Sequence, residues 1–225
     1  GHGHPHLHPD RIRTERALDL SSSCASALRC GALLGLLAFC STSFALDRDA
    51  MLDEANLLVL PRERQLPTVE LVDEQGLSFT SDALRDRWFL LFFGFTACPD
   101  ICPTTLSDMR RLLNQLPPTV RDQLQVILVS ADPARDTPEA LRTYLSYYRA
   151  GLKGLTGEMP ELQKLSKGLG LPFVATTDAT VADYSVSHSR NLAIVGPNGT
   201  LRGHIRAPLK LEGLSKALPQ LIDPR

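Results

Sequence analysis

Two runs of hydrophobic residues, at 88–95 and 124–130, interrupt the chain's otherwise mixed pattern of polar and hydrophobic positions. Short runs rich in Phe, Leu, Val and Ile are typical of strands that are buried on both faces of a sheet. A buried helix is the competing interpretation of the first run. Its length, its aromatic residues and Gly94 favour a strand. We therefore predict that both runs are central strands.

Hydrophobic positions at helical spacing follow each predicted strand. The first helix, over 104–116, is predicted by residues that share one face: Leu106, Met109, Leu112, Leu113 and Leu116. After the second strand, Thr137 is placed to act as an N-cap, with a proline at the first helical position. Similar patterns predict three further helices, over 139–149, 160–169 and 209–222.

Alternating segments around glycine-containing turns predict two hairpins, over 69–80 and 191–206, and a short strand is expected at 152–157. The resulting order is a hairpin, a β-α-β-α half, a helix, a second hairpin and a closing helix. This is the plan of the thioredoxin fold. We therefore predict an α/β protein with a thioredoxin-like fold, in which helices flank a central mixed sheet and a hairpin precedes it.

Two cysteines, Cys98 and Cys102, directly follow the first central strand. Each precedes a proline, which disfavours helical backbone, so residues 98–102 are expected to form a loop and Pro103 to start the next helix. The dipole at that helix N-terminus would favour thiolate over thiol. A structural disulfide is the simplest interpretation of the pair. A bridge across so short a loop removes little unfolded-chain entropy, which favours redox or metal chemistry.

The first 45 residues have the pattern of an export signal. Four arginines precede an apolar stretch, and a small-x-small site predicts cleavage after Ala45. The alternative is an uncleaved membrane anchor. We divide the chain into this leader, a linker over 46–66 and a thioredoxin-like domain over 67–225. In either case the domain is exported, to the periplasm or to the outer side of the inner membrane. The histidine-rich residues 1–8 lie ahead of the leader and are not expected to act in the mature protein.

Formal net charge is -1, which gives no reason to expect a nucleic-acid partner. Without the leader, Cys98 and Cys102 are the only cysteines, and His188 and His204 the only histidines. His204 falls on the polar face of a predicted strand, where a solvated side chain is expected. His188 lies in a loop that could face the thiols, although an ordinary surface histidine fits that position equally well. Two thiolates and one imidazole would select Cu(I), whereas a structural zinc site needs a fourth protein ligand.

With these residues, the chain resembles the Sco/SenC family of copper-handling proteins. The matching stretches are FFGFTACPDICP at 92–103, SADPARDTPE at 130–139, GLTG at 154–157, DYSVSHS at 183–189 and GPNG at 196–199. The resemblance implies that Cys98, Cys102 and His188 are copper ligands and that the two cysteines form a disulfide when oxidised. Ala97 and Ser187 depart from residues that are frequent in the family, but neither departure removes a ligand.

The resemblance also implies a function. A monomeric metallochaperone would carry one copper ion per domain, as Cu(I) or also as Cu(II), to the binuclear copper centre of cytochrome c oxidase subunit II. A copper donor and a thiol reductant, both unidentified, would be further partners, and the membrane would be contacted only through an uncleaved leader. The alternative is a thiol–disulfide oxidoreductase that acts on the cysteines of that copper centre through Cys98 and Cys102.

Overall fold

A computed structural model describes residues 48–174 and 186–223 of the chain. The leader expected at 1–45 therefore lies outside the described residues. Within the described part of the chain, no helix combines the length and the hydrophobicity that crossing a membrane would require.

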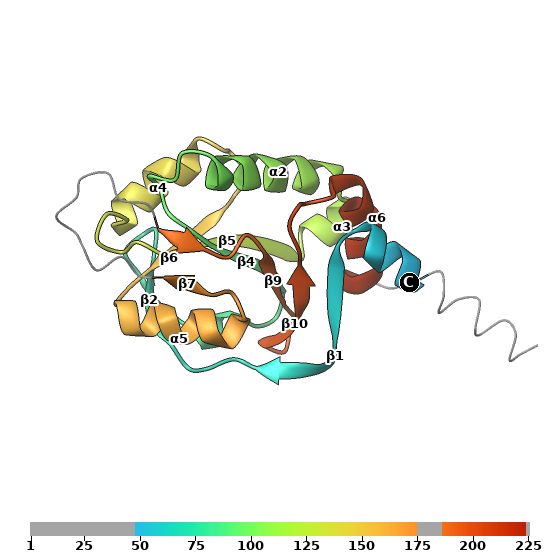
Figure 1. The fold of residues 1–225 in the computed structure, drawn as a ribbon, viewed down its shortest axis with the longest axis horizontal. Helices are drawn as coiled ribbons and strands as arrows, with labels where there is room; N and C mark the ends of the chain where they lie inside the picture. Colours follow the sequence, from blue (N-terminus) through green and yellow to red (C-terminus); the bar gives the residue numbers. More distant parts are fainter. Residues whose placement is uncertain (1–47, 175–185, 224–225) are drawn as a thin grey trace, which may run out of the picture. The chain divides into compact units, whose positions relative to one another are not determined.

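The main element is an eight-stranded mixed sheet with the strand order β1-β10-β9-β4-β5-β6-β2-β3. Strand β4 pairs in parallel with β5 and antiparallel with β9, so β4 is central and its backbone is hydrogen-bonded on both sides (Figure 1). The strands are β1 (Leu57–Gln65), β2 (Glu70–Asp73), β3 (Ser78–Thr80), β4 (Trp88–Gly94), β5 (Leu124–Ser130), β6 (Lys153–Thr156), β9 (Leu192–Val195) and β10 (Thr200–Ile205).

Helices cover both faces of this sheet (Figure 1). Alternate residues of β4 explain the two layers, because successive side chains of a strand point to opposite faces. Leu90 packs in a hydrophobic cluster with α2, α4 and α6, whereas Leu91 packs in a second cluster with α5. The helices are η1 (Ser81–Ala83), α2 (Ile101–Gln115), α3 (Pro118–Arg121), α4 (Pro138–Ser146), α5 (Met159–Leu169) and α6 (Leu211–Ile222), and residues 48–54 are also helical.

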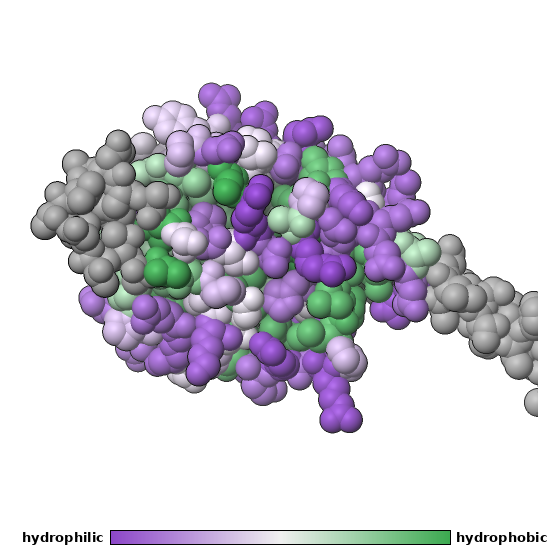
Figure 2. Space-filling view, in the orientation of Figure 1, coloured by the Kyte–Doolittle hydropathy of each residue, from purple (hydrophilic) through white to green (hydrophobic). Residues whose placement is uncertain are grey.

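The predicted thioredoxin-like arrangement is confirmed, including the central strands, both hairpins and the helices that follow them. The side chain of Thr137 accepts a hydrogen bond from the backbone N–H of Ala140, as expected of an N-cap. Outside the core, the face of the molecule in Figure 2 is mainly hydrophilic, and its hydrophobic side chains lie in separate areas.

Three local predictions differ from the structure. Helix α2 begins at Ile101, so Cys102 and Pro103 lie in its first turn, where a missing N–H costs no intrahelical bond. The segment 57–65, which the sequence analysis assigned to the linker over 46–66, is the edge strand β1, paired with β10. A two-residue strand pair, β7 (Phe173–Val174) with β8 (Ser187–His188), forms a separate ribbon that the hydrophobic pattern did not indicate.

Candidate metal centre

Cys98, Cys102 and His188 come together at the end of strand β4. The two Sγ atoms and one imidazole nitrogen lie within 4.8 Å of one another. Among the described residues, this is the only group of three or more Cys, His, Asp or Glu side chains close enough to hold a metal ion. The structure thus brings together the three residues that the family resemblance implied to be copper ligands.

The two thiols are held by different parts of the chain. Cys98 lies in the loop after β4, where its N–H donates to the carbonyl of Phe95 at 3.1 Å. Cys102 lies in the first turn of α2. Both are free thiols and both are buried, with 8% of Cys98 and 1% of Cys102 exposed. Cys98 is therefore the more accessible thiol of the pair.

Gly94 provides the space that the Cys102 side chain occupies. A Cβ atom at position 94 would lie 2.8 Å from Cys102 Sγ and 2.8 Å from a methyl group of Leu128. Only glycine leaves room for sulfur at this point of the strand. Gly94, which favoured a strand in the sequence analysis, is thus also a packing partner of the thiol.

Burial raises the pKa of the Cys102 thiol above its ordinary value, and the neighbouring Cys98 and Asp136 add to this effect. The sequence predicted the opposite direction, from the dipole at the start of α2. That dipole acts at the right place, but the loss of hydration around a thiol with 1% exposure outweighs it. In the folded, metal-free protein, Cys102 is therefore a protonated thiol at neutral pH.

The ribbon of β7 and β8 positions His188. Phe173 is the register partner of His188, and the N–H of Ser189 donates to the carbonyl of Pro172 at 2.8 Å. The ring of Phe173 stacks on Phe93 of β4 with centroids 5.1 Å apart, which fixes the ribbon to the sheet.

Hydrogen bonding sets the tautomer of the His188 imidazole. Its Nδ1 lies 2.9 Å from the carbonyl oxygen of Ser189. A carbonyl can only accept, so Nδ1 carries the hydrogen and Nε2 presents its lone pair. Nε2 is 3.7 Å from Cys102 Sγ, within reach of the thiol hydrogen. A histidine held in this way by its other nitrogen is typical of a metal ligand.

His204 lies outside this group, as predicted, but its side chain is not simply solvated. It is half-buried, and its Nε2 lies 2.7 Å from the carbonyl oxygen of Leu169, in the last turn of helix α5. Its strand alternation was interpreted correctly, but the sequence did not reveal that α5 covers this part of the sheet. The imidazole of His204 therefore provides a hydrogen bond to a carbonyl group at the C-terminus of α5.

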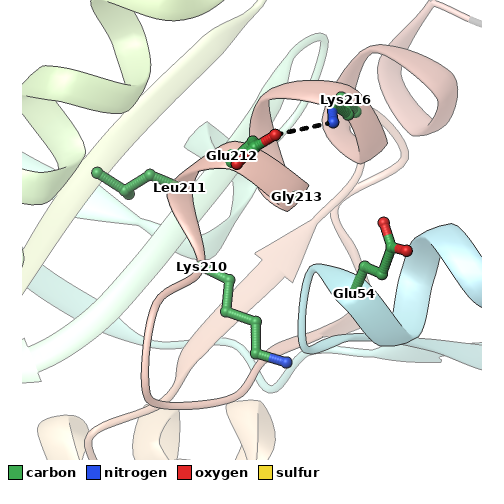
Figure 3. A pocket seen from close by; sticks show the side chains of 6 residues that line it. All are labelled: Glu54, Lys210, Leu211, Glu212, Gly213 and Lys216. Carbon is green, nitrogen blue, oxygen red and sulfur yellow. Dashed lines mark hydrogen bonds and ion pairs between the residues drawn. The ribbon is translucent and has the colours of Figure 1, made fainter.

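The structure also contains a shallow hollow of about 340 Å³ near the start of α6 (Figure 3). Its charges are mixed, and the carboxylate of Glu212 is paired with Lys216 at 3.1 Å. Neither thiol nor His188 contributes to it. The lining residues are Glu54, Lys210, Leu211, Glu212, Gly213 and Lys216.

Comparison with known sequences gives a consistent family match. The model of the SCO1/SenC family matches residues 61–223. A Stutzerimonas stutzeri protein named "Putative copper-binding protein" is 63% identical over 198 residues, which cover 88% of this chain and 97% of that protein. The mitochondrial protein SCO2 of Saccharomyces cerevisiae is 35% identical over 130 residues, which cover 57% of this chain but only 43% of the yeast protein.

Solved structures show the same fold. A crystal structure of yeast Sco1 with copper bound is 29% identical, with a TM-score of 0.64, and the match covers 71% of this chain and 90% of that one. Solution structures of apo Sco1 from Thermus thermophilus are 28% identical, with a TM-score of 0.66, and cover 74% of this chain and 96% of that one.

Proposed function

Since this chain belongs to the SCO1/SenC family, we propose that it is a copper metallochaperone that binds one Cu(I) ion through Cys98, Cys102 and His188. The observation that carries the proposal is the convergence of two thiol sulfurs and an imidazole nitrogen within 4.8 Å of one another. Soft thiolate ligands prefer Cu(I) to hard cations. The copper-bound yeast Sco1 structure, which has the same fold, supports copper as the metal.

Each of the three proposed ligands has a different role in binding copper. Cys98 is the more accessible sulfur, and it is placed to meet the incoming ion first. Cys102 releases its proton when it coordinates, because thiolate rather than thiol is the ligand. His188 completes the site with Nε2, while its Nδ1–H remains bonded to Ser189. When bound, copper would be held by three side chains from two segments of the chain.

The proposal extends to delivery. We infer that the protein is exported, works as a monomer at the outer side of the inner membrane or in the periplasm, and passes its copper to the binuclear centre of cytochrome c oxidase subunit II. A copper donor and a thiol reductant would complete the cycle. Transfer is tested by mixing the copper-loaded protein with the apo soluble domain of subunit II and measuring which of the two holds copper after separation.

A Cu(I) competition titration of the reduced protein tests the binding site. We expect one equivalent to bind, and replacing both cysteines by serine should abolish it. His188→Ala should weaken binding by more than the roughly tenfold that loss of an outer-shell partner costs, but not abolish it, because Cu(I) tolerates two thiolates. His204→Ala is the matched control, since it removes a half-buried imidazole outside the group. Unchanged binding in the double cysteine variant would refute the site.

Thiol–disulfide exchange is the second candidate function, and the two adjacent free thiols favour it. Cys98 and Cys102 would cycle between dithiol and disulfide, with the electrons passing to or from the cysteines of the copper centre. Exchange depends on the two sulfurs and not on an imidazole. His188→Ala therefore separates the candidates: a chaperone loses copper affinity, whereas an oxidoreductase keeps its rate of thiol oxidation.

A further inference from the structure

One buried carboxylate joins the loop that carries Cys98 to the loop after strand β5. Asp136 is 0% exposed, although it lies 40 residues along the chain from its partner Thr96. Its Oδ1 accepts from the Thr96 hydroxyl at 2.6 Å and from the Thr96 N–H at 3.2 Å. Its Oδ2 accepts from the Ser130 hydroxyl at 2.7 Å. The carboxylate therefore binds the residue that starts the thiol loop and the residue that ends β5.

Burying the Asp136 carboxyl group costs free energy, and the pairing of β4 with β5 does not require it. Burial raises the pKa of Asp136, because a charged carboxyl loses its hydration. The backbone already links the two strand ends, since the N–H of Ala131 donates to the carbonyl of Gly94 at 2.8 Å. The hydrogen bonds of Asp136 involve Thr96, two residues after Gly94, where the chain leaves the sheet toward Cys98. They fix the part of the loop that no strand pairing holds.

We propose that Asp136 is a positioning residue for the metal centre: through Thr96 it fixes the thiol loop, and so sets the position of Cys98 relative to Cys102 and His188. This role of Asp136 rests on the proposed function, because it concerns the three proposed copper ligands. The bonds that carry it join Asp136 only to Thr96 and Ser130 and involve none of the three proposed ligands. Asp136 itself lies outside the group of Cys98, Cys102 and His188.

Two variants of Thr96 form a matched test, because the side chain is half-buried and both substitutions stay close to its size. Thr96→Val keeps the shape but removes the hydroxyl that Asp136 binds. Thr96→Ser keeps the hydroxyl. We expect Thr96→Val to lower Cu(I) affinity by about tenfold or more, as for other outer-shell partners, and Thr96→Ser to stay within about twofold of the parent.

A second measurement does not involve copper. In glutathione buffers, oxidation forms the Cys98–Cys102 bond and breaks the glutathione disulfide, and two protons and two electrons pass to the two glutathione thiols. The carboxylate holds the loop in the arrangement of the free thiols, so releasing it should make closure of the bridge easier. We expect the oxidation equilibrium constant to rise about threefold or more in Thr96→Val, and to stay at the parent value in Thr96→Ser.

Thr200→Val is the control for a purely structural effect. It also removes a hydroxyl–carboxylate bond, from Thr200 to Glu63 at 2.7 Å, at the other end of the sheet. It should lower the free energy of unfolding without changing copper affinity or the oxidation equilibrium. Asp136→Ala should lower copper affinity at least as much as Thr96→Val, because it removes the bonds from the Thr96 N–H and from Ser130 as well as the hydroxyl bond. The double variant should match Asp136→Ala alone, because the hydroxyl bond is already lost in that single variant.

The proposal is overturned if Thr96→Val and Thr200→Val give the same copper affinity and the same oxidation equilibrium. It is also overturned if Thr96→Ser behaves like Thr96→Val. If the parent binds no copper, the proposed function fails, but the oxidation equilibria of the three threonine variants still decide whether Asp136 positions the loop. The two failures are therefore distinguishable.

Discussion

The burial of Cys102 links the ionisation of one thiol to the stability of the whole fold. Its pKa is raised in the folded protein, so the unfolded chain loses this proton at a lower pH than the native state does. The stability contributed by the protonated thiol is complete below the pKa of the unfolded thiol, about 8.5. It is lost progressively as the pH rises above that value.

We therefore predict that metal-free protein loses stability between about pH 8.5 and 10, with a slope that approaches about 1.4 kcal/mol per pH unit for this thiol. Denaturant unfolding at several pH values measures it. Cys102→Ser is the control, because serine does not titrate and other groups with high pKa values act equally in both proteins. Parallel curves for the two proteins would contradict the prediction.

Small elements, rather than large ones, position His188, the third of the proposed ligands. The ribbon β7–β8 is two residues long on each strand, yet it contains His188 and is attached to the main sheet through the Phe93–Phe173 stack. A two-stranded ribbon is only marginally stable by itself. The position of the imidazole therefore depends on the ring of Phe173 and on the edge-to-face contact of His188 with Phe95, whose ring centroids are 5.9 Å apart.

Phe173→Ala should lower Cu(I) affinity by about tenfold, because the ribbon loses its contact with β4 and His188 its fixed position. Loss of free energy of unfolding should be limited to about 1–3 kcal/mol, since the side chain is only half-buried. Val174→Ala is the matched control: Val174 is the next residue of the ribbon, but 67% of it is exposed. Equal effects of the two substitutions on copper affinity would refute this role of the stack.

How well an element could be predicted from the sequence depends on the length of that element. The runs at 88–95 and 124–130 and the long amphipathic helices are predictable, because burial dictates their composition over many residues. The ribbon was not predicted, because four residues carry no periodicity. Pro103 was misplaced by two positions, since any of the first turn's N–H groups can be absent without loss.

The same reasoning applies to the site. The Cys98–Cys102 pair was evident from its position after a central strand, and the family resemblance singled out His188. Asp136 was missed as a contributor because its partner Thr96 is 40 residues away, and a sequence shows such a contact only through its fold. The direction of the Cys102 pKa was wrong because the sequence gives the helix dipole but not the depth of burial.

The folded body begins well before the boundary that the sequence indicated. Compact structure extends from Asp49, and β1 completes the sheet beside β10. Leu57 of β1 is buried in the cluster formed with α2, α4 and α6, and Glu63 pairs with Arg202 at 3.2 Å. The segment 57–65 is therefore a structural part of the domain.

Two truncations test this boundary. Removing residues 1–47 should leave the free energy of unfolding and Cu(I) affinity unchanged. Removing residues 1–66 should cost at least about 2 kcal/mol, because Leu57 and the strand pairing with β10 are lost. Thermal or denaturant unfolding of both proteins provides the measurement. A fully stable 67–225 fragment would contradict the assignment of β1 to the domain.

The separation of the three proposed ligands along the chain affects the order in which they become available during synthesis. His188 follows Cys102 by 86 residues, whereas the two cysteines belong to one loop and the adjoining helical turn. A chain that is synthesised from its N-terminus contains both sulfurs before it contains the imidazole, and before β9 can pair with β4. An oxidant that acted during that interval would find two thiols in an unfolded chain, with no imidazole beside them. A bridge formed at that stage would have to be reduced before the two sulfurs could serve as thiolate ligands.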